Sequence, residues 1–269
     1  MPIQIDVDKV LKAKSPKWHR RLPKFVVRWL ERTIHQREMN DFLLTHSDDP
    51  SLAFANNVMD FLQASYHIEN EENVPKDGRY IVVSNHPLGG LDGLCYISLF
   101  SKFRSDIKFP VNDLLMNMEP MKDVFIPINK HGGQSREAIQ TLNDTFASDQ
   151  LILYFPAGLC SRKQKGGKIC DLEWKPTIIS KARQYQRDII PAFFDGKNSN
   201  FFYNFAKIRK QLGIKFNVEM LYLVDEMFRQ KGNTFNITFG KPISYTTFNE
   251  QKTNQEWAQW LKEQTYSLK

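Results

Sequence analysis

A histidine and an aspartate six positions apart are the residues of this chain best suited to proton-transfer chemistry. His86 and Asp92 lie in the segment Ser84-Asn-His-Pro-Leu-Gly-Gly-Leu-Asp-Gly93. An imidazole that is oriented by a carboxylate acts as a general base. Because no activated side-chain nucleophile is evident beside the pair, the pattern predicts a base that deprotonates a substrate hydroxyl directly.

Two other interpretations of the same segment are open. Ser84 in the loop, or Ser161 further along the chain, is a candidate nucleophile, and either one with His86 and Asp92 would make a hydrolase. A Gly-x-Ser-x-Gly elbow would support that reading, and the sequence has none. In the other interpretation His86 only caps a turn, which the order of strand, proline, two glycines and aspartate makes less favoured.

The elements that position this pair are a strand and a helix. Residues 80–83 form an apolar, largely β-branched run, which is typical of a buried strand. Pro87 disfavours helical geometry at His86, and Gly89-Gly90 allow a tight turn. A helix is then expected from about residue 92, so the pair lies on one strand-to-helix loop.

The rest of the chain repeats this alternation. Further strands are expected at 107–110, 124–128, 151–155, 189–194 and 234–239, and helices at 114–118, 135–146, 175–186, 199–211, 218–228 and 248–261. Such alternation predicts the α/β class, with a central mixed, largely parallel sheet covered by helices on both faces. Because loops at strand ends form the sites of such sheets, the loops after residues 83, 128 and 155 should share one pocket.

The N-terminal region is expected to be a helical extension. Residues 10–46 and 50–66 have helical patterns, so we divide the chain into an N-terminal amphipathic region, 1–70, and an α/β domain, 71–269, that pack as one unit. Apolar Phe25 and Trp29 lie opposite Lys24, Arg28 and Arg32. This pattern is typical of a helix lying in a membrane interface, and also of a surface helix packed on its own protein.

Composition narrows the class of partner. The chain has 269 residues, with 37 Lys and Arg against 30 Asp and Glu, a net charge of +7 that suits anionic partners. Zinc, helix-turn-helix and RNA-binding signatures are absent, which argues against nucleic acid. No apolar run approaches the ~20 residues that span a bilayer, and the N-terminus does not resemble a signal peptide.

The three cysteines, Cys95, Cys160 and Cys170, have no metal-ligand spacing and indicate reduced thiols in a cytoplasmic protein. We therefore expect a peripheral protein on the cytoplasmic face of a membrane, without metal. A basic membrane-binding protein without catalytic activity is a third hypothesis.

Four sequence blocks follow one another in a recognisable order. They are Asn85-His86…Asp92, then 125–128 (Phe-Ile-Pro-Ile), then 155–158 (Phe-Pro-Ala-Gly) with Ser161-Arg162, then Ile190-Pro191. This order resembles the glycerolipid (lysophospholipid-type) acyltransferase superfamily over residues 75–245. The resemblance implies transfer of an acyl chain from a coenzyme A or acyl-carrier-protein thioester to a lipid hydroxyl, with no further cofactor.

The resemblance also implies roles for individual residues. His86 would be the base and Asp92 the residue that orients it. The acceptor would be bound by residues of the second and third blocks: Lys130, Phe155, Pro156, Gly158, Ser161 and Arg162. For the oxyanion, backbone N–H groups at Gly93 or Gly158 are candidates.

The sequence departs from the common family pattern at three places. Five residues, Pro87 to Leu91, separate His86 from Asp92 where four are usual, Ala157 replaces a glutamate, and Asn129-Lys130 stand near the place of an arginine. These features resemble the branch that acylates amino-acid lipids (ornithine or glycine lipids) and the proteins labelled haemolysins. We expect the departures to affect the choice of acceptor more than the base.

Overall fold

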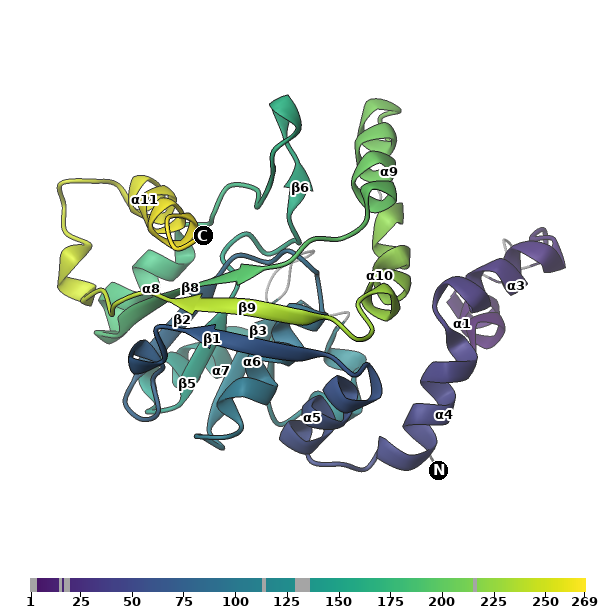
Figure 1. Cartoon of the computed structure of the whole chain (residues 1–269), viewed down its shortest axis with the longest axis horizontal. Coiled ribbons are helices and arrows are strands. Elements are labelled where there is room, and N and C mark those ends of the chain that lie inside the picture. Colours follow the sequence, from purple (N-terminus) through teal and green to yellow (C-terminus); the bar gives the residue numbers. More distant parts are fainter. Residues whose placement is uncertain (1–3, 15, 17–19, 113–114, 129–135, 215–216) are drawn as a thin grey trace.

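The computed structural model describes residues 4–14, 16, 20–112, 115–128, 136–214 and 217–269. A seven-stranded sheet in the order β1-β9-β8-β2-β5-β3-β4 runs through its centre (Figure 1). The strands are β1 (Ser65–Glu69), β2 (Tyr80–Ser84), β3 (Ile107–Val111), β4 (Phe125–Pro127), β5 (Leu151–Tyr154), β8 (Asp188–Asp195) and β9 (Thr234–Phe239). A separate hairpin pairs β6 (Arg162–Lys163) with β7 (Ile169–Cys170).

The sheet is mixed but largely parallel. β8, β2, β5, β3 and β4 run in one direction, whereas β9 is antiparallel to β8, and β1 is parallel to β9. Val83 on β2 is in register with Tyr154 on β5 and with Pro191 on β8. The loops that leave the carboxyl ends of β2 and β5 therefore start at one edge of the sheet, as the sequence predicted. The third predicted loop, after residue 128, lies outside the described residues, and a pocket shared by all three stays a prediction.

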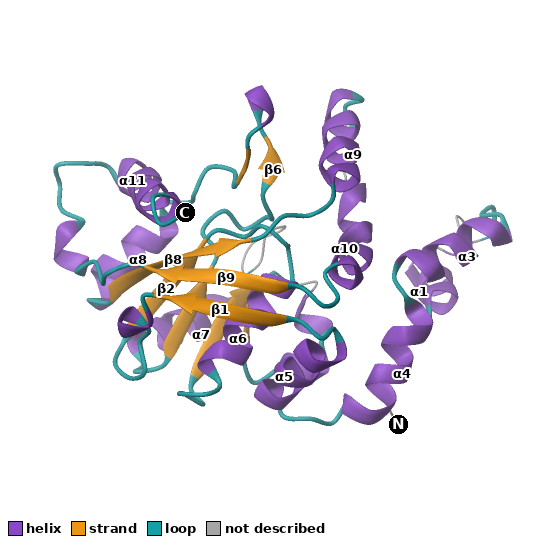
Figure 2. Ribbon diagram, viewed as in Figure 1, coloured by secondary structure: helices purple, strands orange, loops and turns teal. Residues whose placement is uncertain are grey.

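Helices cover both faces of the sheet (Figure 2). Val82 of β2 points into one core with α5 (Ser51–Phe61) and α6 (Leu91–Phe100). Its neighbours Ile81 and Val83 point into another core with α7 (Arg136–Ala147), α8 (Thr177–Tyr185) and α11 (Asn254–Tyr266). This alternation is the reason that β2 reads as a continuous apolar run, and the predicted α/β class is confirmed.

The N-terminal helices α1 (Val7–Lys14), α3 (Lys24–Thr33) and α4 (Gln36–His46) lie to one side of the sheet, beyond α10 (Leu223–Arg229) (Figure 1). Of the helices in the described part of the chain, none is long and apolar enough to cross a membrane. Whether α3 lies in a membrane interface stays a prediction.

Residues 65–69 correct the sequence analysis. They were included in the helical region 1–70, with a helix expected up to residue 66, but α5 ends at Phe61 and β1 begins at Ser65. Gln63 has a φ of 50°, in the left-handed region, which ends the helix. Tyr66 and Ile68 are half-buried between exposed neighbours, the alternation of an edge strand, and β1 pairs with β9 inside the central sheet.

Several boundaries also differ. The C-terminal helix begins at Asn254 instead of 248, because Thr253 and Glu256 form a capping box there. The segment 218–228 divides into a 3₁₀ helix, η5 (Val218–Tyr222), and α10. The expected short helix at 114–118 is a 3₁₀ turn at Leu115–Asn117, and Ser135, expected to cap α7, lies outside the described residues.

Candidate active site

The loop between β2 and α6 brings His86 and Asp92 into contact. Nδ1 of His86 lies 2.9 Å from Oδ2 of Asp92, whose side chain is fully buried. The His86 side chain is 15% exposed. Because Nδ1 faces the carboxylate, Nε2 is the ring nitrogen left to meet a substrate, and within the described residues no hydrogen-bond partner of Nε2 is found.

Backbone N–H groups hold the carboxylate of Asp92 in place. Leu88 N–H donates to Oδ2 at 2.9 Å, and Gly89 N–H donates to the same oxygen at 3.4 Å. Gly89 has a φ of +81°, which lets the longer loop turn back over the start of α6. The five residues between His86 and Asp92 thus fold into a turn that still joins the imidazole to the carboxylate.

An aromatic platform lies against the imidazole. The rings of His86 and Phe155 are stacked, with centroids 4.2 Å apart and an angle of 19° between their planes. Phe155 in turn meets the edge of Phe109 at 5.1 Å. Phe155, expected to bind the acceptor, therefore supports the ring of His86.

Asp171 is a residue of the site that the sequence analysis missed. Its Oδ1 accepts hydrogen bonds from the backbone N–H of His86 (3.1 Å) and from the Ser161 hydroxyl (2.6 Å). The Trp174 indole donates to Oδ2 at 2.9 Å. Burial raises the pKa of Asp171, while the hydrogen bonds from Ser161 and Trp174 act in the opposite direction.

The same cluster grips the main chain of His86 on both sides. Ser161 N–H donates to the carbonyl oxygen of His86 at 2.7 Å, so Ser161 and Asp171 together hold both peptide groups of this residue. Asp171 N–H donates to the Tyr266 hydroxyl at 2.8 Å, which connects the cluster to α11. No spacing or motif in the sequence marks Asp171, because its contact depends on the β6–β7 hairpin folding back towards β2.

The two serines proposed as nucleophiles have other partners. The Ser84 hydroxyl is bonded to the Asn85 carbonyl oxygen (2.9 Å) and to the Tyr96 hydroxyl (2.8 Å). The Ser161 hydroxyl donates to Asp171. Both serines are buried, so the geometry gives no support to a hydrolase built on either hydroxyl.

Arg162 is tied into a buried ion-pair cluster. Its Nη2 lies 3.0 Å from Oε1 of Glu219, which is fully buried, and Nη1 donates to the Cys160 carbonyl oxygen at 2.9 Å. Arg209 also binds Glu219, with Nε 3.0 Å from Oε2. Two guanidinium groups on one carboxylate leave one positive charge in excess within this cluster, although protein acceptors already occupy Arg162.

The remaining third-block residues build a turn. Pro156 is buried, and its carbonyl oxygen accepts a hydrogen bond from Lys175 N–H at 3.1 Å. Gly158 has a φ of +64°, and its N–H donates to Phe155 O at 3.0 Å. Lys130 lies outside the described residues. Contact of these residues with an acceptor stays a prediction.

Both N–H groups predicted to hold the oxyanion already have partners. The Gly158 N–H closes the turn just described, and the Gly93 N–H donates to Oδ1 of Asp92 at 2.9 Å. In this conformation each N–H group is already used within the protein, and a role of either one in binding the oxyanion stays a prediction. Gly93 has a packing role instead, because a Cβ there would lie 2.7 Å from Cε1 of Phe109.

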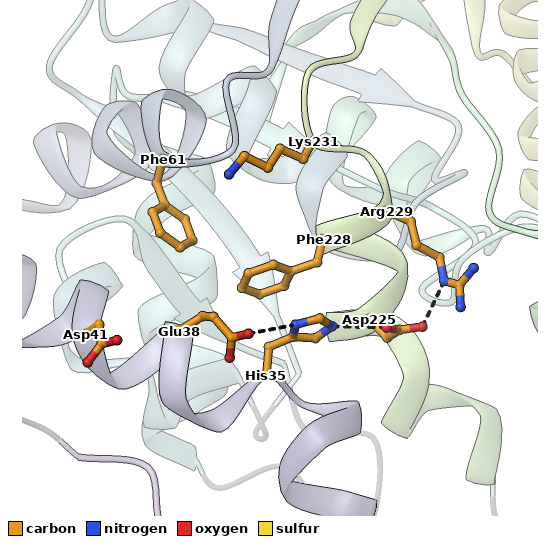
Figure 3. Close-up of a pocket in the computed structure, with 8 residues that line it drawn as sticks. All are labelled: His35, Glu38, Asp41, Phe61, Asp225, Phe228, Arg229 and Lys231. Atoms are coloured by element: carbon orange, nitrogen blue, oxygen red, sulfur yellow. Dashed lines mark hydrogen bonds and ion pairs between the residues drawn. The ribbon is translucent and has the colours of Figure 1, made fainter.

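A cavity of about 610 Å³ lies between the N-terminal helices and α10, and none of its lining residues belongs to the His86 site (Figure 3). His35 Nε2 lies 3.0 Å from Oδ1 of Asp225, and its ring stacks on Phe228 with centroids 4.0 Å apart. These contacts dock the junction of α3 and α4 on α10. In the described part of the chain, no cluster of three His, Cys, Asp or Glu side chains could hold a metal ion.

The chain is similar to a family of known proteins and to two individual relatives over nearly its whole length. The model of a family described as "Acyltransferase" matches residues 9–269. The lyso-glycine lipid O-acyltransferase of Bacteroides thetaiotaomicron is 47% identical over 265 residues, which cover 98% of this chain and 97% of that protein. The protein of the same name from Phocaeicola vulgatus is 46% identical, covering 98% and 95%.

Among solved structures, the chain is similar to the 1-acyl-sn-glycerophosphate (LPA) acyltransferase PlsC from Thermotoga maritima. The TM-score is 0.49 at 17% identity, and the match covers 81% of this chain and 78% of that one.

Proposed function

Because the chain belongs to the acyltransferase family, we propose that it transfers a fatty acyl group to the hydroxyl of a lyso-glycine lipid. The family resemblance predicted from the sequence is confirmed, and the chain is an acyltransferase. Two relatives that match nearly the whole chain at 47% and 46% identity are named for lyso-glycine lipid O-acylation. Their names support the same acceptor here.

The observation that carries the mechanism is the contact between His86 and the buried carboxylate of Asp92. In the proposed reaction Nε2 of His86 takes the proton of the acceptor hydroxyl, and the hydroxyl oxygen attacks the thioester carbonyl carbon. The carbon–sulfur bond then breaks, and the proton on Nε2 passes to the departing sulfur. Asp92 keeps Nδ1 protonated and stabilises the imidazolium formed between these steps.

The donor we propose is a thioester of acyl carrier protein or coenzyme A, with no other cofactor. Both carriers are anionic, which suits a chain of net charge +7. A thioester is already activated, so a base for the hydroxyl and a surface that excludes water meet the main needs of the reaction. The enzyme would work as a peripheral protein on the cytoplasmic face of the membrane, where its lipid acceptor is embedded.

Two features of the third block and its neighbours are compatible with an anionic head group. Ala157, where the wider superfamily usually has glutamate, is buried among apolar residues. It brings no carboxylate to residues 155–162, which we call the acceptor block. The cluster of Arg162, Arg209 and Glu219 keeps one positive charge in excess. Without a glutamate at position 157, the carboxylate of a glycine head group would meet one like charge fewer.

The lipid content of a strain that lacks this protein tests the acceptor. We expect the diacylated glycine lipid to disappear and its mono-acylated precursor to accumulate, with both changes reversed by the wild-type gene. A normal glycine-lipid profile, or loss of a different diacylated lipid, would contradict the proposed acceptor. Consumption of thioester by the purified protein without any lipid acceptor would favour a hydrolase instead.

A further inference from the structure

One face of α9 (Asn200–Gln211) exposes large apolar side chains. Phe201 is 48% exposed, Ile208 52% and Leu212, just past the helix end, 70%. With half-buried Phe205 they follow the spacing of a single helix face. The opposite face carries Phe202 and Tyr203, which are buried against Cys160, so α9 is seated on the acceptor block by one side and leaves the other to solvent.

Tyr222 of η5 joins this face of α9 to α3. Its ring centroid lies 4.9 Å from that of Phe201, 5.5 Å from Phe205 and 5.8 Å from Trp29. Trp29 and Phe25 of α3 are themselves exposed. We call the continuous surface the α3–α9 strip; it consists of Phe25, Trp29, Phe201, Phe205, Ile208, Leu212 and Tyr222.

A second contact keeps α3 beside η5 and α10. The pairing of His35 with Asp225 and the stacking of His35 on Phe228 bind the end of α3 to α10 (Figure 3). In Figure 1, α3 and α9 project on the same side of the sheet. The two halves of the strip are therefore fixed relative to each other by the Trp29–Tyr222 and His35–Asp225 contacts.

Both helices of the strip also carry exposed cations. Lys24 and Arg28 are exposed on α3, and Lys207 and Lys210 are exposed on α9, which has no acidic residue. Lys163 of the β6–β7 hairpin reaches α9, with its Nζ 3.3 Å from Oδ1 of Asn204. The two helices thus combine an apolar stripe, a tryptophan and a tyrosine with several exposed cations.

We propose that the α3–α9 strip binds the surface of a bilayer that contains anionic lipid, with α9 as a second contact besides the N-terminal helices. Aromatic rings suit the headgroup zone, aliphatic side chains insert below it, and the exposed cations of the two helices attract the anionic surface. Because the buried face of α9 packs on the acceptor block, this contact would place the catalytic loop beside the lipids. The inference rests on the proposed function only in taking the membrane as the place of reaction.

The double variant Ile208→Gln/Leu212→Gln tests this inference. We expect its partitioning onto phosphatidylcholine vesicles that contain phosphatidylglycerol to fall at least about tenfold, since two inserted aliphatic side chains are lost. Ile139→Gln, on exposed but unrelated α7, is the matched control and should partition as the wild type does. The rate of acyl transfer to an acceptor dispersed in detergent should be the same in both variants as in the wild type. This measurement also serves as the control for correct folding.

Three results would overturn the inference. One is unchanged vesicle partitioning of the double variant. Another is that, without lipid, the wild type is a dimer and the double variant a monomer, as measured by light scattering. That result would show that the strip binds a second copy of this chain. The third is loss of acyl-carrier-protein binding with vesicle binding intact. Vesicle binding requires no turnover, so the His86→Ala protein should partition normally, and a wrong acceptor assignment would leave this test unaffected.

Discussion

The carboxylate of Asp171 accepts a hydrogen bond from the backbone N–H of His86 at 3.1 Å, across 85 residues of sequence. The imidazole of His86 is thus positioned from two directions. Asp92 holds Nδ1 of the ring, and Asp171 with Ser161 holds the main chain. A base that must meet a lipid hydroxyl needs both its tautomer and its position fixed, and the two aspartates divide these tasks.

Replacing Asp171 should slow catalysis without abolishing substrate binding. In Asp171→Asn the amide N–H₂ would face either the Trp174 indole or the two groups that donate to Oδ1, all of which are donors. At least one hydrogen bond is lost, and the main chain of His86 is held less firmly. We expect kcat to fall by about ten- to a hundredfold with KM little changed, because misplacement affects the reacting geometry. Ser161→Ala should show a smaller loss of the same kind.

Exposed Glu173, two residues from Asp171, provides the control. Glu173→Gln should leave both kinetic constants unchanged. If Asp171→Asn melts at the wild-type temperature and keeps wild-type kcat, Asp171 has no positioning role. An equal fall of activity and folded fraction would point to a purely structural role.

Gly93→Ala tests the aromatic platform under His86. The added Cβ would lie 2.7 Å from Cε1 of Phe109, and Phe109 contacts Phe155, on which His86 stacks. Displacement of this stack should lower kcat by about tenfold or more. Phe109→Leu in the same chain makes room and should restore part of the rate.

Gly90→Ala is the matched control, because a Cβ at Gly90 meets nothing within 4 Å. Steady-state kinetics of Gly93→Ala, of Gly93→Ala combined with Phe109→Leu, and of Gly90→Ala test whether the stack positions His86. Equal rates for Gly93→Ala and Gly90→Ala would show that the stack does not position His86.

The docking of the N-terminal helices should depend on pH through Asp225. Partial burial raises the pKa of Asp225, but hydrogen bonds from His35 and Arg229 outweigh this effect, so the pKa lies below its ordinary value. A lowered folded-state pKa contributes stability above the unfolded value of about 3.9, and that stability is lost as the pH falls through the folded value. We therefore expect docking to persist at pH 5 to 7 and to weaken only under stronger acid.

Hydrogen exchange of amides in α3 and α4 measures this docking. Asp225→Asn should lower their protection at neutral pH, while amides of the central sheet stay unchanged. Wild-type protection that already falls between about pH 7 and 5, with Asp225→Asn behaving identically, would contradict a role for the carboxylate.

The sequence was most informative where structure depends on neighbouring residues. The run at 80–83, Pro87 and the two glycines predicted the strand, loop and helix that carry His86 and Asp92, because each of these signals acts within a few residues. Parallel order then placed the loops after β2 and β5 at one edge. In β1, Tyr66 and Ile68 alternate with polar residues, which is typical of a strand, but the sequence interpretation extended the preceding helix to residue 66.

What the sequence could not reveal depends on contacts between distant segments. Asp171 looks like any polar residue until the β6–β7 hairpin brings it to the His86 peptide. Arg162 reads as a ligand for an anion, yet Glu219 on η5 accepts from its guanidinium. The N–H groups of Gly93 and Gly158 were predicted as donors to the oxyanion, but they donate to the Asp92 carboxylate and to the Phe155 carbonyl oxygen. Contacts of this kind join residues that are far apart in the sequence, so no regular spacing of residues reveals them.

The most direct test of the central claim is the turnover of purified His86→Ala with an acyl thioester and lyso-glycine lipid. General-base catalysis contributes about a hundred- to ten-thousandfold, so the account predicts a loss of at least that size in a protein that melts at the wild-type temperature. Mass spectrometry of the diacylated product measures it. Near-normal turnover by a folded His86→Ala protein would contradict the assignment of His86 as the base.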